Sequence, residues 1–167
     1  MFLTGKQIID NGCISGDAPH VNGAGVDLSI GALGKLDYKI CKLQHITDDD
    51  IIWQNPNKAG NWTLHAGRSY IAVTREEVHA QTMDHPPKPL LGIIQLRSSL
   101  ASCGVSMATA FVDPGFHGPL RLPLVCNNGS GFYLEPGARI CQVAFTIVDD
   151  GAEMYHGHYQ NREFGKP

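Results

Sequence analysis

The sequence predicts an all-β protein whose short strands form a sandwich or a jelly-roll-like closed sheet. First, 19 glycines and 10 prolines divide the apolar residues into short runs, which is typical of strands joined by tight turns. Second, such runs follow one another closely from Leu90 to Val148. Third, a length of 167 residues suits one hydrophobic core, so we expect a single domain over residues 1–167.

The first predicted element is a short amphipathic helix near the N-terminus. Thr4 and Gln7 have the spacing of a capping box, in which each side chain accepts a hydrogen bond from the other residue's backbone amide. Asn11-Gly12 then ends the helix. We expect this helix to support the scaffold and to carry no chemistry.

The other predicted elements are strands, and the polar loop around residues 48–57 separates the early ones. Within the first strand, Asp27 is unusual because an acid in a strand needs a partner, so it either fixes a turn or receives a ligand hydroxyl. A turn is expected at Ala66-Gly67, and a type II turn at Glu135-Pro-Gly137. In chain order, the strands are expected at residues 23–31, 36–41, 62–74 (interrupted by the first of these turns), 90–96, 105–112, 120–126, 132–134 and 139–148.

The bulk composition excludes several classes of partner. A net charge of -3 and a pI near 6.2 argue against a nucleic-acid binder, which needs a broad basic face. No apolar run approaches the roughly 18 to 20 residues that span a bilayer, so we expect no membrane partner. Five cysteines without CxxC spacing and without a secretory leader indicate free thiols in a reducing cytoplasm.

The stretch from Arg97 to Gly118 has the composition of an anion pocket with a base beside it. The Arg97 guanidinium can chelate phosphate oxygens in a bidentate fashion, and Ser98 and Ser99 add hydroxyl groups. Asp113 follows in an Asp-Pro-Gly turn, about one hairpin's return distance later. We therefore expect the Asp113 carboxylate to face whatever anion this segment holds.

Histidines are numerous enough to raise the question of zinc. His79, His85, His117, His156 and His158 show neither the HxxxH helical spacing nor a His-x-Glu with a Pro-Cys-x-x-Cys partner. The spacing therefore rejects a zinc deaminase. Each histidine is expected to be a surface or hydrogen-bonding residue, although His117 and His158 lie close to the expected site in sequence.

Several motifs in this order resemble the dCTP deaminase and trimeric dUTPase superfamily, and the resemblance covers nearly the whole chain. The motifs of the deaminase branch are Leu3-Thr-Gly-Lys-Gln-Ile-Ile9, Val26-Asp-Leu-Ser-Ile-Gly31, Leu64-His-Ala-Gly67, Thr74-Arg-Glu-Glu-Val78, Arg97-Ser-Ser-Leu-Ala101, Val112-Asp-Pro-Gly-Phe-His-Gly118, Pro136-Gly-Ala-Arg-Ile-Cys-Gln142 and the segment Tyr155 to Gln160. Such a resemblance implies a distorted β-barrel or jelly roll of the dUTPase-like type, assembled as a homotrimer with active sites shared between neighbouring subunits.

The resemblance also implies a ligand and a set of site residues. The ligand is a deoxyribonucleoside triphosphate, dUTP and possibly dCTP, with Mg²⁺ held through the triphosphate and not by a protein metal site. Asp113 lies near the sugar and the attacking water. The segment of about residues 155–167 mixes aromatics, amides and cations, and two alternatives stay open for it: it frays, or it closes over the nucleotide as a mobile lid. The residues implied to bind substrate are Arg97, Ser98, Ser99 and Gln142 on the triphosphate, with Tyr159 and Gln160, and Phe116 where dUTPases place a tyrosine under the deoxyribose.

Two positions depart from the deaminase pattern. Deaminases of this type use an arginine to steady the activated water and a glutamate to shuttle protons, and here these positions are Ser102 and Pro123. Neither residue can transfer a proton, a step that contributes about 10² to 10⁴ in rate. Hydrolysis of dUTP to dUMP and pyrophosphate needs only a carboxylate, cations and a closed site. The sequence thus favours a dUTP pyrophosphohydrolase with Asp113 as general base.

Two alternatives stay open. One is a dCTP deaminase or a bifunctional dCTP deaminase and dUTPase, which requires another acid, such as Glu135 or Glu153, in the space left at Pro123. The other is a catalytically silent trimeric nucleotide-binding protein that keeps the fold and the phosphate pocket.

Overall fold

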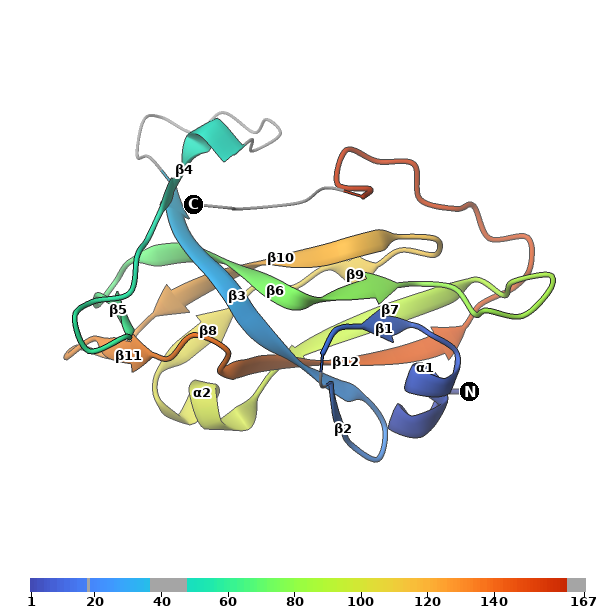
Figure 1. Ribbon diagram of the computed structural model, residues 1–167, viewed down its shortest axis with the longest axis horizontal. Helices are drawn as coiled ribbons and strands as arrows, with labels where there is room; N and C mark the ends of the chain where they lie inside the picture. The colour runs from blue at the N-terminus through green and yellow to red at the C-terminus, as the bar shows by residue number, and fades with distance from the viewer. Residues whose placement is uncertain (18, 37–47, 162–167) are drawn as a thin grey trace.

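A computed structural model describes residues 1–17, 19–36 and 48–161, which form a curled β-sheet with a short helix near the N-terminus (Figure 1). The elements are α1 (Gly5–Asp10), β1 (Ile14–Ser15), β2 (His20–Val21), β3 (Val26–Leu36), a 3-10 helix η1 (Asp48–Asp50), β4 (Ile51–Trp53), β5 (Trp62–Leu64), β6 (Ser69–His79), β7 (Leu90–Leu96), α2 (Ser98–Ser102), β8 (Val105–Met107), β9 (Phe111–Val112), β10 (His117–Cys126), β11 (Phe132–Leu134) and β12 (Arg139–Ile147).

The main sheet is antiparallel and runs in the order β8-β10-β6-β3-β12-β7-β9. Strand β1 also pairs with β6, strands β2 and β4 pair with β3, and β5 pairs with β11 in a small second sheet. The two ends of the main order, β8 and β9, are joined in the chain by Ala108-Thr109-Ala110 alone. Because so short a connection cannot cross a flat sheet, the sheet must curl until its ends approach, which gives the barrel-like shape.

The all-β prediction and the helix near the N-terminus are confirmed. Both hydrogen bonds of the capping box between Thr4 and Gln7 are present, and β7 and β11 begin and end at the predicted residues. Gly137 has a φ of 79° and the amide of Ala138 donates to the carbonyl of Glu135, as a type II turn requires. The predicted strand at 36–41 lies outside the described residues apart from its first residue.

The prediction of one strand over residues 105–112 is wrong. This segment forms β8, which pairs with β10, and β9, which pairs with β7 at the other end of the sheet. Alternation of apolar residues alone does not reveal that the chain changes partner at Ala108-Thr109-Ala110. Helix α2 was not predicted either, since five residues with three serines carry too weak a periodic signal.

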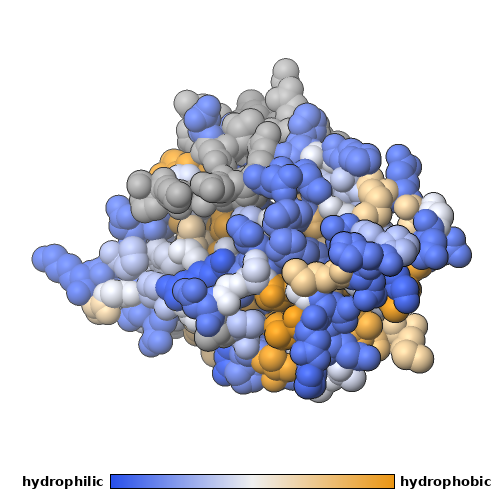
Figure 2. Space-filling model, turned by 45° about the vertical axis from the view of Figure 1, so that its right-hand side comes forward, coloured by the Kyte–Doolittle hydropathy of each residue, from blue (hydrophilic) through white to orange (hydrophobic). Residues whose placement is uncertain are grey.

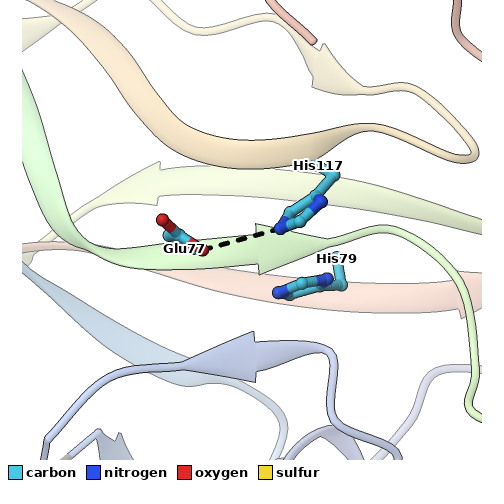
Figure 3. A group of neighbouring side chains, drawn as sticks. All are labelled: Glu77, His79 and His117. Atoms are coloured by element: carbon cyan, nitrogen blue, oxygen red, sulfur yellow. Dashed lines mark ion pairs between the residues drawn. The ribbon is translucent and has the colours of Figure 1, made fainter. Parts of the chain in front are cut away.

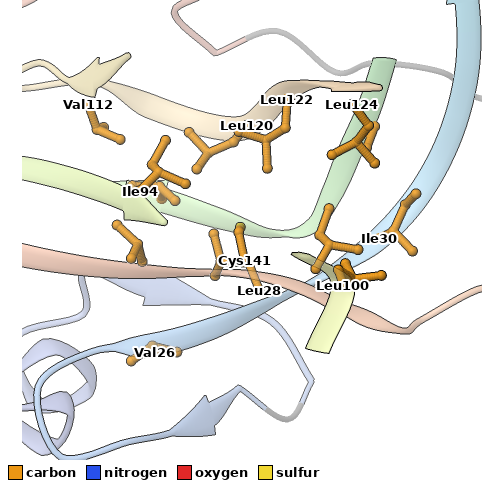
Figure 4. Close-up of a cluster of buried hydrophobic side chains, with 14 of the residues drawn as sticks. Val26, Leu28, Ile30, Ile94, Leu100, Val112, Leu120, Leu122, Leu124 and Cys141 are labelled. Carbon is orange, nitrogen blue, oxygen red and sulfur yellow. The ribbon is translucent and has the colours of Figure 1, made fainter. Parts of the chain in front are cut away.

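The core fills the inside of the curl. Strand β10 shows the expected alternation, with Leu120, Leu122 and Leu124 buried and the residues between them more exposed. These leucines face buried residues of β3, β7 and β12, as Figure 4 shows for part of the cluster. Each fully buried aliphatic side chain contributes about 1.5–3 kcal/mol by leaving water. Tight packing therefore fixes the strand ends from which the functional side chains project.

Four cysteines of the described residues, Cys13, Cys103, Cys126 and Cys141, are free thiols, as predicted, and Cys41 lies outside these residues. None of the helices in the described part of the chain has the length and apolar character needed to cross a membrane.

Candidate functional site

A charged cluster surrounds Asp27 on β3. The carboxylate is only 4% exposed, and its Oδ2 accepts hydrogen bonds from Nη1 of Arg97 and, at 3.2 Å, from Nη1 of Arg139. His20 Nδ1 lies 3.4 Å from the same oxygen, and Asn22 Nδ2 donates to Oδ1 at 2.7 Å. A buried carboxylate needs such partners because desolvation would otherwise penalise its charge. Two guanidiniums are thereby held side by side.

Strand register explains how this cluster forms from distant segments. Asp27 is the Cα partner of Gln142 on β12 and of His20 on β2, while β7 on the far side of β12 ends one residue before Arg97. The Asn22 bond spans the connection between β2 and β3, so Asp27 helps to fix a turn, one of the two roles open from the sequence. Its main contacts, to Arg97 and Arg139, were not foreseen.

The predicted triphosphate ligands gather beside this cluster. Arg97 is the N-terminal cap residue of α2, Ser98 and Ser99 begin that helix with exposed side chains, and Gln142 is half-buried. Arg139, in the same motif as Gln142, adds a second cation that sequence reasoning missed. Arg139 lies beside Asp27 because β12 pairs with β3. The motif Pro136-Gly-Ala-Arg139 alone does not indicate that pairing.

A second buried carboxylate, Glu76 on β6, lies near this region. Its oxygens accept hydrogen bonds from the Ser29 amide at 2.7 Å and the Ser29 hydroxyl at 2.6 Å. Burial, together with the negative charges of Glu76 and Asp27, raises the pKa of the Cys141 thiol to about 12. This part of the molecule therefore combines low solvent access with paired charges.

A cavity of about 500 Å³ forms the other candidate region. The Asp113 carboxylate is exposed on its wall, and Phe116 and Tyr159 lie in the same wall. The remaining lining is mainly aliphatic and aromatic, contributed by Ile51, Ile71, Ile94, Ala108, Thr109, Ala110, Phe111, Val112, Pro119, Leu120, Arg121, Leu122, Pro123 and Tyr155. A pocket with apolar walls and a few polar groups suits a small organic ligand such as a nucleoside.

The turn that carries Asp113 is fixed by the segment after β12. Gln160 Oε1 accepts from the His117 amide at 2.9 Å, and its Nε2 donates to the Gly115 carbonyl at 2.8 Å. Tyr155 donates its amide to the Pro114 carbonyl at 2.7 Å and packs edge-to-face on Phe116, with ring centroids 5.6 Å apart. In this chain, the Gln160 side chain thus binds the turn itself, while Tyr159 lies at the cavity.

Within one chain, Asp113 does not lie beside Arg97, the first of the predicted triphosphate ligands. Val112 pairs with Gly92 in an antiparallel register, so Asp113 is level with Leu91 on β7. Arg97 lies six residues further along, which corresponds to roughly 20 Å at the rise of a β-strand. Within one chain, Asp113 therefore lies away from Arg97, because the segment after α2 returns to the middle of β7 and not to its end. That Asp113 faces an anion held by Arg97 of a neighbouring subunit stays a prediction.

The two departures from the deaminase pattern have different locations. Pro123 lines the cavity, whereas Ser102 is exposed at the end of α2. Asp113 is the only acid in the cavity wall among the described residues, and neither Glu135 nor Glu153 lies there. Within one chain, no second carboxylate of the described residues fills the space left at Pro123.

Known proteins provide an independent comparison. A family model described as dCTP deaminase-like matches residues 4–148. The dCTP deaminase, dUMP-forming, of Methanobrevibacter smithii is 28% identical over 160 residues, which cover 92% of this chain and 79% of that protein. The dCTP deaminase of Thermococcus gammatolerans is 30% identical over 82% of this chain and 76% of its own length. A probable deoxyuridine 5'-triphosphate nucleotidohydrolase of Methanosarcina acetivorans is 42% identical, over 45% of this chain and 44% of that protein.

Solved structures of a dCTP deaminase and of a dUTPase share the fold of this chain. The 2'-deoxycytidine 5'-triphosphate deaminase from Agrobacterium tumefaciens matches with a TM-score of 0.64 at 17% identity, covering 86% of this chain and 46% of the deaminase chain. The EIAV dUTPase matches with a TM-score of 0.54 at 14% identity, covering 90% of this chain and 98% of the dUTPase. Because the family model spans most of the chain and the fold agrees with it, the chain belongs to the dCTP deaminase-like family.

Proposed function

We propose that the chain is a dUTP pyrophosphohydrolase that converts dUTP to dUMP and pyrophosphate. The observation that carries this proposal is the cavity wall, in which Asp113 is the only acid among the described residues. Pro123, which the sequence resemblance aligns with the deaminase glutamate, lines the same wall. A single carboxylate is sufficient for hydrolysis but leaves deamination without its proton shuttle. Relatives named as dUTP nucleotidohydrolases and as dUMP-forming dCTP deaminases support a uracil nucleotide as substrate or product.

In the proposed reaction, the Asp113 carboxylate orients a water molecule and accepts its proton as the oxygen attacks the α-phosphorus. The bond from the α-phosphorus to the bridging oxygen breaks, and pyrophosphate leaves. Phe116 packs under the deoxyribose and Tyr159 assists in binding the triphosphate, while Gln160 contributes by fixing the turn that carries Asp113. Arg97, Ser98, Ser99 and Gln142 bind the triphosphate, where the guanidinium held by Asp27 offsets negative charge in the transition state.

Mg²⁺ fits this site only as an ion carried on the triphosphate. The buried Asp27 carboxylate already binds two guanidiniums, and the described residues contain no cluster of three carboxylates. Mg²⁺ prefers oxygen ligands and retains several waters, so water molecules and the phosphate oxygens of the nucleotide would supply most of its ligands. When bound, the ion would polarise the phosphoryl oxygens and help pyrophosphate to leave.

We further propose a homotrimer with active sites shared between subunits. The separation of Asp113 from Arg97 along one chain supports this arrangement, because a neighbouring subunit could bring its own Arg97, Ser98 and Ser99 to the cavity. Exposed apolar side chains such as Phe2 and Phe111, at 53% and 63% exposure, offer contact surface. Figure 2 shows hydrophobic residues gathered on one face and bordered by hydrophilic ones.

A second function, deamination of dCTP, is favoured by the family model and by the deaminase relatives. One assay separates the possibilities. The protein is incubated with Mg²⁺ and either dUTP or dCTP, and pyrophosphate and the nucleotide products are quantified. We expect dUMP and pyrophosphate from dUTP and no uracil nucleotide from dCTP. Uracil nucleotides from dCTP would overturn the hydrolase-only assignment, and binding without any product would identify a silent nucleotide-binding protein.

A further inference from the structure

We propose that Glu77, His79 and His117 form a binding site for a divalent transition-metal ion of the Zn²⁺ class. Each residue offers one ligand atom, and these atoms all lie within 4.8 Å of one another. Figure 3 shows the three side chains projecting together from the neighbouring strands β6 and β10. The site is separate from the Asp27 cluster and does not depend on the proposed hydrolase activity.

Strand geometry fixes the arrangement. Glu77 and His79 are two residues apart on β6, so their side chains leave the same face of the sheet. His117 is the Cα partner of His79 on β10, which places the two imidazoles directly opposite each other. Their ring centroids are 3.9 Å apart. The three side chains are therefore presented by rigid backbone, and no loop has to fold to bring them together.

The distances suit a small tetrahedral ion. His117 Nε2 lies 3.5 Å from Glu77 Oε2. An ion bound tetrahedrally at about 2.0–2.2 Å from nitrogen and oxygen ligands holds neighbouring ligand atoms roughly 3.3–3.6 Å apart. That pair already has the required separation, and small rotations of the side chains would bring the third ligand to the same distance.

The ligand types select the class of ion. Two imidazoles and one carboxylate form a set that zinc uses with a fourth position left for water or another ligand. Imidazole nitrogen favours the later first-row divalent ions, whereas Mg²⁺ prefers oxygen ligands in an octahedron. The site should thus bind Mg²⁺ that accompanies a nucleoside triphosphate only weakly. Side-chain exposures of 41% for His117 and 49% for Glu77 leave a path for the ion from solvent.

A bound ion would join two functional parts of the chain. His117 follows the turn that carries Asp113, and its backbone carbonyl accepts from the Asn161 amide at 2.8 Å. On the other side, Ser15 Oγ of β1 lies 3.5 Å from His79 Nε2 and can bond a water on the ion. The ion would therefore tie β6 to the start of β10 and stiffen the attachment of residues 155–161.

Calorimetric titration of the full chain with Zn²⁺ tests the site, in a Cys103→Ser background that removes an exposed competing thiol. We expect one ion per chain, and a visible Co²⁺ spectrum typical of tetrahedral nitrogen and oxygen ligands. His79→Gln and His117→Gln should each weaken binding by about tenfold to a hundredfold or more, as judged from the cost of even indirect metal contacts. His65→Gln, which changes an exposed histidine outside the cluster, should leave the affinity unchanged.

Circular dichroism shows whether each variant is folded. If a histidine variant is unfolded, Glu77→Gln replaces it as the variant that lacks a metal ligand. The proposal is overturned if the parent binds no Zn²⁺ saturably, if the ligand variants bind it as tightly as the parent, or if an equal concentration of Mg²⁺ displaces it. In those cases the contacts among Glu77, His79 and His117 act only as strand-to-strand packing and ion pairing.

Discussion

The Asp27 cluster and the Asp113 cavity are built on opposite principles. In the cluster, a carboxylate that is 4% exposed holds two arginines, and both of its oxygens accept hydrogen bonds from protein groups. In the cavity, an exposed carboxylate is the only acid that the described residues contribute to a wall made mainly of apolar side chains. The first arrangement fixes cations in place, and the second leaves a base accessible to a water molecule and a nucleoside.

This difference supports the proposal that the active site is shared between subunits. Binding a triphosphate needs positioned cations, whereas attack on its α-phosphorus needs an accessible base, and along this chain the two lie roughly 20 Å apart. In the proposed oligomer, the cations of one subunit would meet the base of its neighbour. The following predictions test that division, beginning with the largest expected effect.

Asp113→Asn should lower the rate of pyrophosphate release from dUTP by about 10² to 10⁴, because the amide orients water but cannot accept its proton. Binding of dUTP should stay within a few-fold of the parent, since the triphosphate contacts lie elsewhere. Initial rates and equilibrium titration measure the two effects separately. Asp84→Asn, at another exposed aspartate, provides the matched control and should leave the rate unchanged. Full activity in Asp113→Asn would show that another group is the base.

Mixing two inactive variants tests whether the site is shared. Arg97→Gln and Asp113→Asn chains are coexpressed with different tags and purified as mixed oligomers. The first chain keeps Asp113, and the second keeps Arg97. If each site of a trimer takes Arg97 from one subunit and Asp113 from its neighbour, every purified mixed trimer has one complete site of three, so about a third of the parent activity should return. Mixed oligomers without recovery would show that both residues act within one chain.

The sequence predicted the elements of the fold that depend on local patterns. Alternating burial identified β7 and β10, and the capping box identified α1, because each depends on neighbours within a few residues. The assignment of Arg97, Ser98, Ser99 and Gln142 as anion ligands stays a prediction. The sequence could not reveal the Asp27–Arg139 contact or the crossing from β8 to β9, since both depend on which strands pair.

The histidines illustrate the same limit. A search for helical HxxxH spacing passed over His79 and His117, which are 38 residues apart in the chain yet opposite each other across β6 and β10. Cross-strand pairs have no fixed sequence spacing, because the length of the connection between two strands varies freely. A prediction of strand register would have been necessary to find this cluster.

Asp27→Asn should weaken both stability and substrate affinity, because it leaves two guanidiniums without their shared anion. We expect a loss of about 1–3 kcal/mol in the free energy of unfolding, below the cost of a fully buried pair since Arg97 and Arg139 are 27% and 40% exposed. The KM for dUTP should rise more than kcat falls, because a released Arg97 samples many positions. Asp10→Asn, at an exposed ion pair with Lys6, should change stability by no more than about 0.5 kcal/mol.

The smallest expected effect is a pH dependence caused by the Cys141 thiol. Burial, with the added influence of Glu76 and Asp27, raises its pKa from 9.0 to about 12, so the folded chain binds this proton more tightly than the unfolded chain. The resulting stabilisation is complete below pH 9 and is lost as the pH rises from 9 towards 12. A single thiol with this shift should cost roughly 1 kcal/mol between pH 8 and pH 10.

Replacing Cys141 by valine, which is similar in size, should remove this contribution, so that urea denaturation at pH 8 and pH 10 shows a smaller loss of stability than in the parent. Cys103→Ser should keep the parent's pH dependence because that thiol is exposed. An unchanged slope in Cys141→Val would mean that folding does not raise the pKa of this thiol enough to affect stability in this pH range.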